Sequence, residues 1–150
     1  MITVSDRCAA GEAVDRSGPA VARLLEEAGY DVAGRHVIPD EVEEIRTLLR
    51  RATSDLVVTT GGTGLAARDV TPQATASVLD YEVPGIPEEM RRAGLGTTPM
   101  AILSRGLAGV RGRTLVVNLP GSERGATESL AAVLPAIGHA LEQLRGNTAH

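Results

Sequence analysis

Residues 56–64 read LVVTTGGTG, a short apolar run that passes directly into a glycine-rich loop. A continuous apolar run of this length is typical of a strand that is buried on both faces of a parallel sheet. Glycine permits positive φ angles and lets backbone N–H groups approach a ligand closely. Such a loop can cradle an anion, although the same residues also suit a plain turn between a strand and a helix.

The segments on either side of this loop alternate between strand and helix patterns. Short apolar runs predict strands at 2–4, 30–38, 56–59 and 114–117. Apolar residues at helical spacing predict helices over 17–28, 42–52, 68–79, 86–93 and 127–144. Residues 100–103 suit either element, and residues 5–17 suit a loop before the hydroxyl of Ser17, which we expect to cap the first helix. This alternation indicates an α/β fold with a mostly parallel sheet.

Length and composition bound the class of protein. A chain of 150 residues predicts one domain, spanning 1–150. The composition, with 43% hydrophobic and 23% charged residues, is ordinary for a globular protein. No apolar run approaches the roughly 18 residues of a membrane span, and no leader pattern is present, so we expect a cytoplasmic protein without a membrane partner. The net charge of −4 argues against a dedicated nucleic-acid binder.

Several residue types are missing, and their absence excludes some chemistries. All fifteen basic residues are arginine, so a phosphate-loop lysine and a Schiff base are impossible. The chain has neither Phe nor Trp for stacking nucleic-acid bases. The single cysteine, Cys8, excludes an intrachain disulfide and is interpreted as incidental. The three histidines have no metal-ligand spacing, so solvated or core roles are expected for His36, His139 and His150.

Polar residues follow each predicted strand, where ligands bind in α/β folds. Asp40 follows one strand and Asp69 follows the glycine loop, so we expect both carboxylates on one rim. Asp40 also suits the N-cap of the next helix, and Asp6 with Arg7 suits a surface ion pair. A carboxylate beside an anion-binding loop makes sense where a divalent cation bridges it to a phosphate.

The glycine loop also fits a dinucleotide-binding pattern loosely, as GTGLAA at 62–67. The helix does not open on the third position of that pattern, however, and the preceding strand is the third of the chain rather than the first. A nicotinamide-dependent oxidoreductase is therefore a remote alternative.

Seven segments, in chain order, resemble the MogA/MoaB family of molybdenum-cofactor proteins and the G domain of gephyrin. They are TVSDR at 3–7, DRSGP at 15–19, IPDE at 38–41, TTGGTG at 59–64, RDVTPQAT at 68–75, LSR at 103–105 and VNLPGS at 117–122. The resemblance implies the molybdopterin-binding fold, a three-layer α/β/α sandwich on a mixed, mostly parallel sheet. It also implies a homotrimer, with a hexamer as the variant seen in some relatives.

The activity implied by the resemblance is Mg²⁺-dependent adenylylation of molybdopterin by ATP, which yields adenylyl-molybdopterin and pyrophosphate. The alternatives are a non-catalytic carrier of the MoaB type and a gephyrin-like scaffold. By resemblance, Asp40 and Asp69 are the catalytic pair and the Mg²⁺ ligands. The residues that the resemblance assigns to the substrate and nucleotide are Ser5, Asp6, Ser17, Gly18, Thr60, Gly61, Gly62, Thr63, Gly64, Ser104, Asn118, Pro120, Gly121 and Ser122.

One departure from the family pattern concerns phosphate binding. Many relatives carry Pro-Lys soon after the Leu-Pro-Gly stretch, where this chain has Glu123-Arg124. We expect Arg124 to stand in for the lysine, although the two cations bind phosphate with different geometry.

Overall fold

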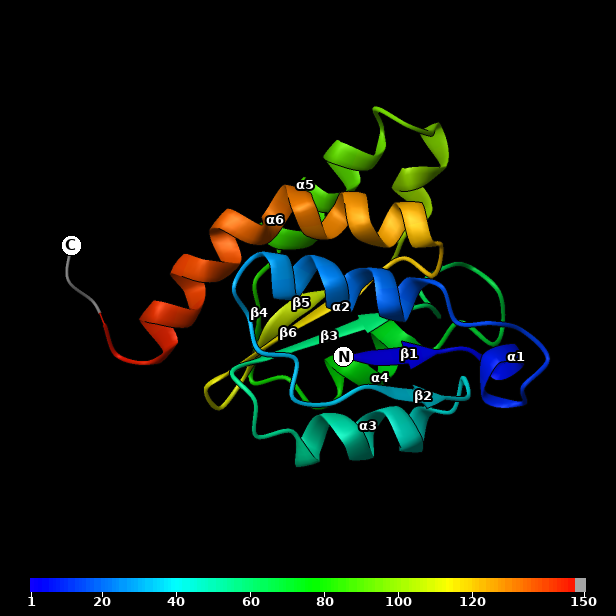
Figure 1. Ribbon diagram of the computed structural model, residues 1–150, viewed down its shortest axis with the longest axis horizontal. Coiled ribbons are helices and arrows are strands. Elements are labelled where there is room, and N and C mark those ends of the chain that lie inside the picture. The colour runs from blue at the N-terminus through cyan, green and yellow to red at the C-terminus, as the bar shows by residue number, and fades with distance from the viewer. Residues whose placement is uncertain (148–150) are drawn as a thin grey trace.

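The computed structural model describes residues 1–147, which form a six-stranded sheet in the order β2-β1-β3-β6-β5-β4 (Figure 1). The strands are β1 Ile2–Val4, β2 His36–Ile38, β3 Leu56–Thr60, β4 Tyr81–Glu82, β5 Ala108–Arg111 and β6 Thr114–Leu119. The first four in the sheet order pair in parallel, and β5 runs antiparallel to both β6 and β4. The prediction of a mixed, mostly parallel sheet is therefore confirmed.

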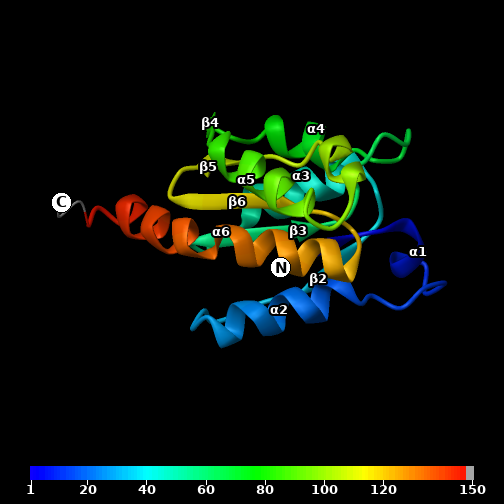
Figure 2. The same ribbon diagram turned by 90° about the horizontal axis from the view of Figure 1, so that it is seen from above.

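Helices cover both faces of this sheet and complete three layers (Figures 1 and 2). One face packs against α2 Ser17–Glu27, α5 Gly85–Gly94 and α6 Glu123–Leu144. The other face packs against α3 Val42–Arg51 and α4 Thr71–Ala76. Two short pieces, α1 Asp6–Ala9 and the 3₁₀ helix η1 Pro99–Leu103, lie in the connections. In residues 1–147, none of the helices combines the length and apolarity that crossing a bilayer requires.

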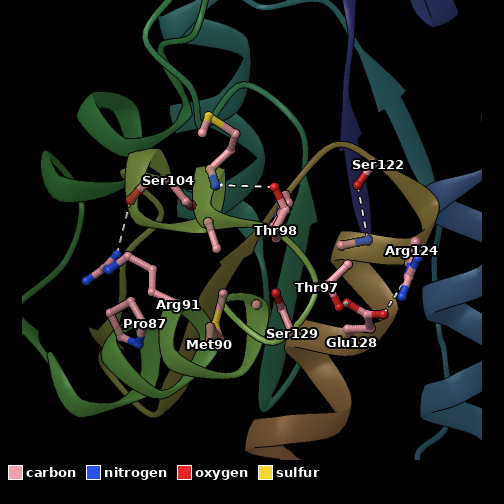
Figure 3. Close-up of a pocket in the computed structure, with 15 residues that line it drawn as sticks. Pro87, Met90, Arg91, Thr97, Thr98, Ser104, Ser122, Arg124, Glu128 and Ser129 are labelled. Carbon is pink, nitrogen blue, oxygen red and sulfur yellow. Dashed lines mark hydrogen bonds and ion pairs between the residues drawn. The ribbon is translucent and has the colours of Figure 1, made fainter.

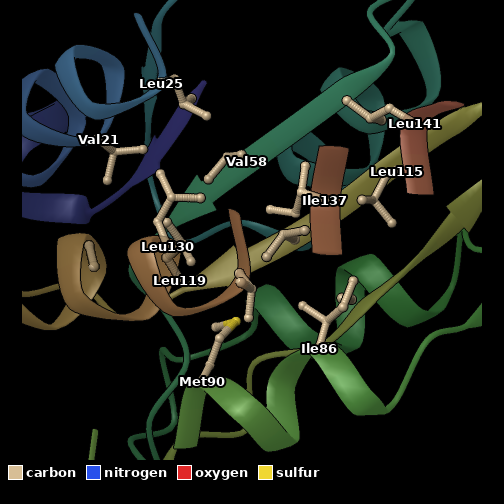
Figure 4. Close-up of a cluster of buried hydrophobic side chains, with 14 of the residues drawn as sticks. Val21, Leu25, Val58, Ile86, Met90, Leu115, Leu119, Leu130, Ile137 and Leu141 are labelled. Atoms are coloured by element: carbon tan, nitrogen blue, oxygen red, sulfur yellow. The ribbon is translucent and has the colours of Figure 1, made fainter. Parts of the chain in front are cut away.

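The central strands explain why two separate cores form. Successive side chains of a strand point to opposite faces of its sheet. In β6, Leu115, Val117 and Leu119 belong to the core under α2, α5 and α6, of which Figure 4 labels Leu115 and Leu119. Val116 belongs to the core under α3 and α4. All of β6 is buried, so burial of one strand stabilises both layers of helices.

The predicted elements and the observed ones differ mainly at the edges of the sheet. Within the predicted strand 30–38, only His36–Ile38 pairs, because β2 is an exposed edge strand. Residues 100–103 form a 3₁₀ helix after Pro99. The loop expected over 5–17 contains α1, and α4 ends at Ala76 rather than at 79.

The antiparallel pair of β4 and β5, whose strands are separated in the chain by α5 and η1, was not predicted, since its pattern is short and interrupted by glycine. Gly109 is required there because a Cβ at that position would lie 2.5 Å from the backbone oxygen of Tyr81 on the neighbouring strand. A glycine in a strand often marks such a close approach.

Candidate functional site

The parallel strands end at a common edge of the sheet, beyond which α1 lies (Figure 1). The segments that follow β1, β2, β3 and β6 meet there and line a cavity of about 560 Å³, which we call the carboxylate cavity. Of the predicted site residues, it contains Ser5, Ser17, Asp40, Thr60, Gly61, Gly62, Asp69, Gly121 and Ser122. The two aspartates therefore lie on one rim, as the sequence predicts.

The glycine loop brings both carboxylates close to the backbone. Gly61 and Gly62 have φ angles of 90° and 66°, which a residue with a side chain rarely adopts. A Cβ on Gly62 would lie 2.9 Å from Oδ1 of Asp40, and one on Gly64 would lie 2.8 Å from Oδ2 of Asp69. Glycine at these two positions thus leaves the space that the two carboxylates occupy.

Asp40 does not cap α3, so the N-cap alternative is wrong. The N-cap is Glu41, and its side chain makes no capping hydrogen bond. Oδ2 of Asp40 instead accepts a 2.9 Å hydrogen bond from the backbone N–H of Asp6, while the N–H of Asp40 donates to Oδ1 of Asp6, also at 2.9 Å. Burial raises the pKa of Asp40, and the negative charges of Asp6 and Asp69 act in the same direction.

Asp69 is held by its own turn and by an arginine from a distant segment. Its Oδ2 accepts a 3.0 Å hydrogen bond from the N–H of Ala66. Arg105 donates to the carbonyl oxygens of Gly64 at 2.8 Å and Asp69 at 2.6 Å. These bonds fix the loop that carries Asp69 against the segment after η1.

The start of α2 forms the opposite wall of the carboxylate cavity. Asp15, not Ser17, satisfies the first turn of this helix, because its Oδ1 accepts the N–H of Gly18 at 2.9 Å. The hydroxyl of Ser17 lies 2.9 Å from Oγ1 of Thr60. Among the described residues that line this cavity, Arg16 is the one basic side chain.

Five predicted site residues line neither of the cavities described here: Asp6, Gly18, Thr63, Gly64 and Asn118. Asn118 is fully buried, and its amide donates to the hydroxyls of Thr59 and Thr75 at 3.0 Å each. Both of its N–H groups are therefore engaged beneath the loop. Asp6 faces Arg68, whose hydrogen bonds lower the pKa of the Asp6 carboxyl.

A second cavity of about 250 Å³ lies between α5, η1 and the start of α6 (Figure 3). Apolar side chains that include Pro87, Met90 and Ala101 line it together with the hydroxyl groups of several Ser and Thr residues. Ser104 and Pro120 of the predicted set lie here, and Ser122 lines both cavities. We call this the α5–η1 cavity.

Arg124, the residue expected to replace a lysine, lies on the wall of the α5–η1 cavity. Its Nε donates to Oε1 of Glu128 at 2.7 Å, and Oε2 of Glu128 accepts from Thr97 at 2.9 Å (Figure 3). The side chain of Arg124 is 73% exposed, so this ion pair is solvated and contributes little to stability.

Some residues around both cavities were missed by the sequence analysis. Asp15 and Arg16 stand directly before a helix that could be predicted, and an acidic residue there signals an N-cap. Met90, Thr97 and Thr98 carried no local signal, because the α5–η1 cavity arises from packing between segments. Cys8 lines the carboxylate cavity, His36 and His139 are exposed, and His150 lies outside the described residues.

The acidic residues suit magnesium rather than an all-protein metal site. Within residues 1–147, no group of three or more His, Cys, Asp or Glu side chains is arranged to hold a metal ion. Mg²⁺ usually binds through one or two carboxylates together with substrate phosphates. Asp40, whose carboxylate lies against Gly62, and Asp69, whose carboxylate lies against Gly64, supply that number of carboxylates.

Comparison with known proteins gives a consistent result. A family model described as a probable molybdopterin binding domain matches residues 1–139. Molybdopterin adenylyltransferase of Helicobacter pylori is 40% identical over 153 residues, which cover 98% of this chain and 87% of that protein. Gephyrin of Dictyostelium discoideum is 39% identical over 94% of this chain, which spans only 21% of gephyrin.

Solved structures agree with this result over nearly the whole fold. The molybdopterin biosynthesis enzyme MoaB from Thermus thermophilus superposes with a TM-score of 0.91 at 52% identity, over 97% of this chain and 94% of that one. A structure of MogA gives a TM-score of 0.90 at 42% identity, over 95% and 96% of the two chains.

Proposed function

The chain belongs to the molybdopterin-binding domain family of molybdenum cofactor biosynthesis, and from that premise we propose that it is a molybdopterin adenylyltransferase. In the proposed reaction, a terminal phosphate oxygen of molybdopterin attacks the α-phosphorus of ATP. The bond from that phosphorus to the β-phosphate oxygen breaks, and pyrophosphate leaves. The observation that carries the proposal is the placement of Asp40 and Asp69 against one glycine loop in one cavity.

Nucleotidyl transfer depends on positioning and on neutralisation of charge, and the carboxylate cavity has groups for both. The backbone at Gly61 and Gly62 lines the cavity, and Arg16 supplies a cation for phosphate oxygens. The carboxylates of Asp15, Asp40, Asp69 and Glu123 would repel a triphosphate that arrived alone. Mg²⁺ held by Asp40 and Asp69 would offset that repulsion and neutralise charge on the phosphates.

The α5–η1 cavity offers a place for the heterocycle of molybdopterin. Its apolar side chains around Met90 suit a flat ring, and its Ser and Thr hydroxyls suit the polar edges of a pterin. Ser122 lines both cavities, so a molecule bound in one can extend into the other. We therefore assign the ring of molybdopterin to the α5–η1 cavity and ATP to the carboxylate cavity.

The proposal predicts a loss of turnover without a loss of binding. Asp40→Asn and Asp69→Asn should each lower the rate of adenylyl transfer by roughly 100-fold or more, because each removes a charge that acts on the phosphates. Both variants should still bind molybdopterin, since its ring is assigned to the other cavity. Product formation by chromatography and molybdopterin affinity by fluorescence titration measure the two properties.

The matched control is Asp31→Asn, which changes an exposed aspartate that lines neither the carboxylate nor the α5–η1 cavity. It should retain the wild-type rate. Wild-type turnover in Asp40→Asn and Asp69→Asn would remove both carboxylates from the mechanism.

We propose in addition that the protein assembles as a homotrimer. Four apolar side chains between α5 and the end of η1 are 45–63% exposed: Leu95, Met100, Ile102 and Leu103. An exposed apolar patch of this kind often marks a contact between proteins. We assign this surface, the η1 patch, to contacts with other copies of the chain.

A further inference from the structure

Arg68 joins three segments that lie far apart in the sequence. It belongs to the loop between β3 and α4, next to Asp69. Its Nε and Nη2 donate to Oδ2 and Oδ1 of Asp6, both at 2.9 Å, and Nη2 also donates to Oε1 of Glu41 at 2.9 Å. A guanidinium has the planar fork that this arrangement requires.

The same contacts reach Asp40 through Asp6. The backbone N–H of Asp6 donates to Oδ2 of Asp40, and the N–H of Asp40 donates to Oδ1 of Asp6, the oxygen that Nη2 of Arg68 also holds. Oδ2 of Asp40 is thereby fixed, while Oδ1 lies against Gly62 in the carboxylate cavity. We call Arg68, Asp6, Asp40 and Glu41 the Arg68 network.

Stability does not account for this network. The side chains of Arg68, Asp6 and Glu41 are 57%, 41% and 54% exposed, and ion pairs with such exposure contribute little to the free energy of unfolding. The network instead connects the loop that carries Asp69 to the segment that carries Asp40. Its geometry therefore bears on the distance between the two carboxylates.

We propose that Arg68 and Asp6 are positioning residues, which hold Asp40 and Asp69 at a fixed separation before substrate binds. This inference rests on the proposed adenylyl transfer. Neither residue touches the reacting atoms in this account. Arg68 acts through Asp6, and Asp6 acts through its paired hydrogen bonds with Asp40.

The test compares Arg68→Met with Arg92→Met. Arg92, whose side chain is 73% exposed, also makes a two-pronged pair, with Glu89 at 2.6 Å for both bonds, and it lines neither the carboxylate nor the α5–η1 cavity. Arg68→Met should lower kcat by about 10- to 100-fold, because a small displacement of a reacting group has effects of that size. The KM values for ATP and molybdopterin should stay within about threefold of wild type, since the proposed binding surfaces are intact.

A double variant tests whether Arg68 acts through Asp6. Asp6→Asn combined with Arg68→Met should be no more than about twofold slower than the slower single variant, because both changes break one chain of contacts. If the loss of kcat in the double variant equals the product of the losses in the two single variants, the proposal is overturned. A kcat for Arg68→Met within twofold of that for Arg92→Met would also overturn it.

Hydrogen exchange gives a readout that needs no turnover. The amides of Asp6 and Asp40 should exchange at least tenfold faster in Arg68→Met than in wild type or Arg92→Met, without substrate. Unchanged exchange rates of these two amides in Arg68→Met would overturn the proposal that Arg68 holds Asp40 in place. If wild type forms no adenylyl-molybdopterin, the proposed function fails, and the exchange measurement alone then decides whether Arg68 fixes Asp40.

Discussion

At the scale of single residues, Asp40 shows a conflict between stability and function. Burial and the negative charges of Asp6 and Asp69 raise the pKa of this carboxyl, and they outweigh the hydrogen bond from the backbone N–H of Asp6 and the positive charge of Arg68, which lower it. The folded state therefore holds the Asp40 proton more tightly than the unfolded chain does. The contribution of Asp40 to the free energy of unfolding is most favourable below the ordinary pKa of 3.8. It falls as the pH rises through the raised pKa of the folded state, and above that pKa the loss is complete.

Asp40→Asn should consequently raise the melting temperature at pH 7 by about 1–3 °C in the absence of divalent cations. The gain should disappear below about pH 4, where Asp40 is protonated in both states. Thermal unfolding followed by circular dichroism in EDTA, from pH 3.5 to 7.5, measures the difference. A lower melting temperature for Asp40→Asn than for wild type at pH 7 would contradict this interpretation.

The candidate pair could be predicted from the sequence, because each aspartate follows a strand and parallel strands end at one edge. The positions of Asp6 and Asn118 could not be predicted in the same way. The partners of Asp6 lie 34 and 62 residues away, and Asn118 bonds residues 43 and 59 positions earlier. Local patterns carry no information about such contacts.

At the scale of elements, the turn from β3 into the glycine loop depends on one close approach. A Cβ on Gly61 would overlap the carbonyl oxygen of Val4 on the neighbouring strand β1. Gly29, after α2, has a nearly identical φ of 91°, but a Cβ there would meet nothing within 4 Å. Alanine at Gly29 therefore measures the effect of a side chain at positive φ alone, whereas alanine at Gly61 adds the overlap with the backbone of Val4.

Gly29→Ala should destabilise the protein by about 1–2 kcal/mol, the usual effect of a side chain at positive φ. Gly61→Ala should destabilise it by about 3 kcal/mol or more, since the backbone of β1 must also shift. Urea unfolding of both variants measures the free energies. Equal losses in the two variants would show that the contact with Val4 does not constrain the turn.

The helices could be predicted because their apolar residues recur at helical spacing, and each of the five predicted helices has a counterpart in α2 to α6. The edge strands β2 and β4, and β5 beside β4, were partly or wholly missed. These strands are too short for a clear apolar pattern, and β4 pairs with β5 across a separation of 27 to 29 residues. A pairing of that kind is decided by the assembled sheet rather than by local preference.

At the scale of the whole molecule, the η1 patch is the surface that we propose for contacts between copies of the chain. Met100 lies in this patch and also lines the α5–η1 cavity, so a neighbouring copy would border the proposed pterin site. The three-layer fold itself followed from the alternation of strands and helices together with the family resemblance.

Ile102→Asp should convert the proposed trimer to monomers, because it places a charge on a surface that would be buried. Light scattering after size-exclusion chromatography measures the mass. Val37→Asp, which changes an exposed apolar residue on β2, is the control and should leave the assembly unchanged. A monomeric wild-type protein would contradict the trimer.

The reaction that we propose for this chain joins AMP to molybdopterin. The most direct measurement incubates the wild-type protein with molybdopterin, Mg²⁺ and ATP labelled at the α-phosphate, and follows label and pyrophosphate together. Label should enter adenylyl-molybdopterin, with one pyrophosphate released for each product formed. Saturable binding of molybdopterin with no pyrophosphate release would contradict the proposed reaction and would indicate a carrier.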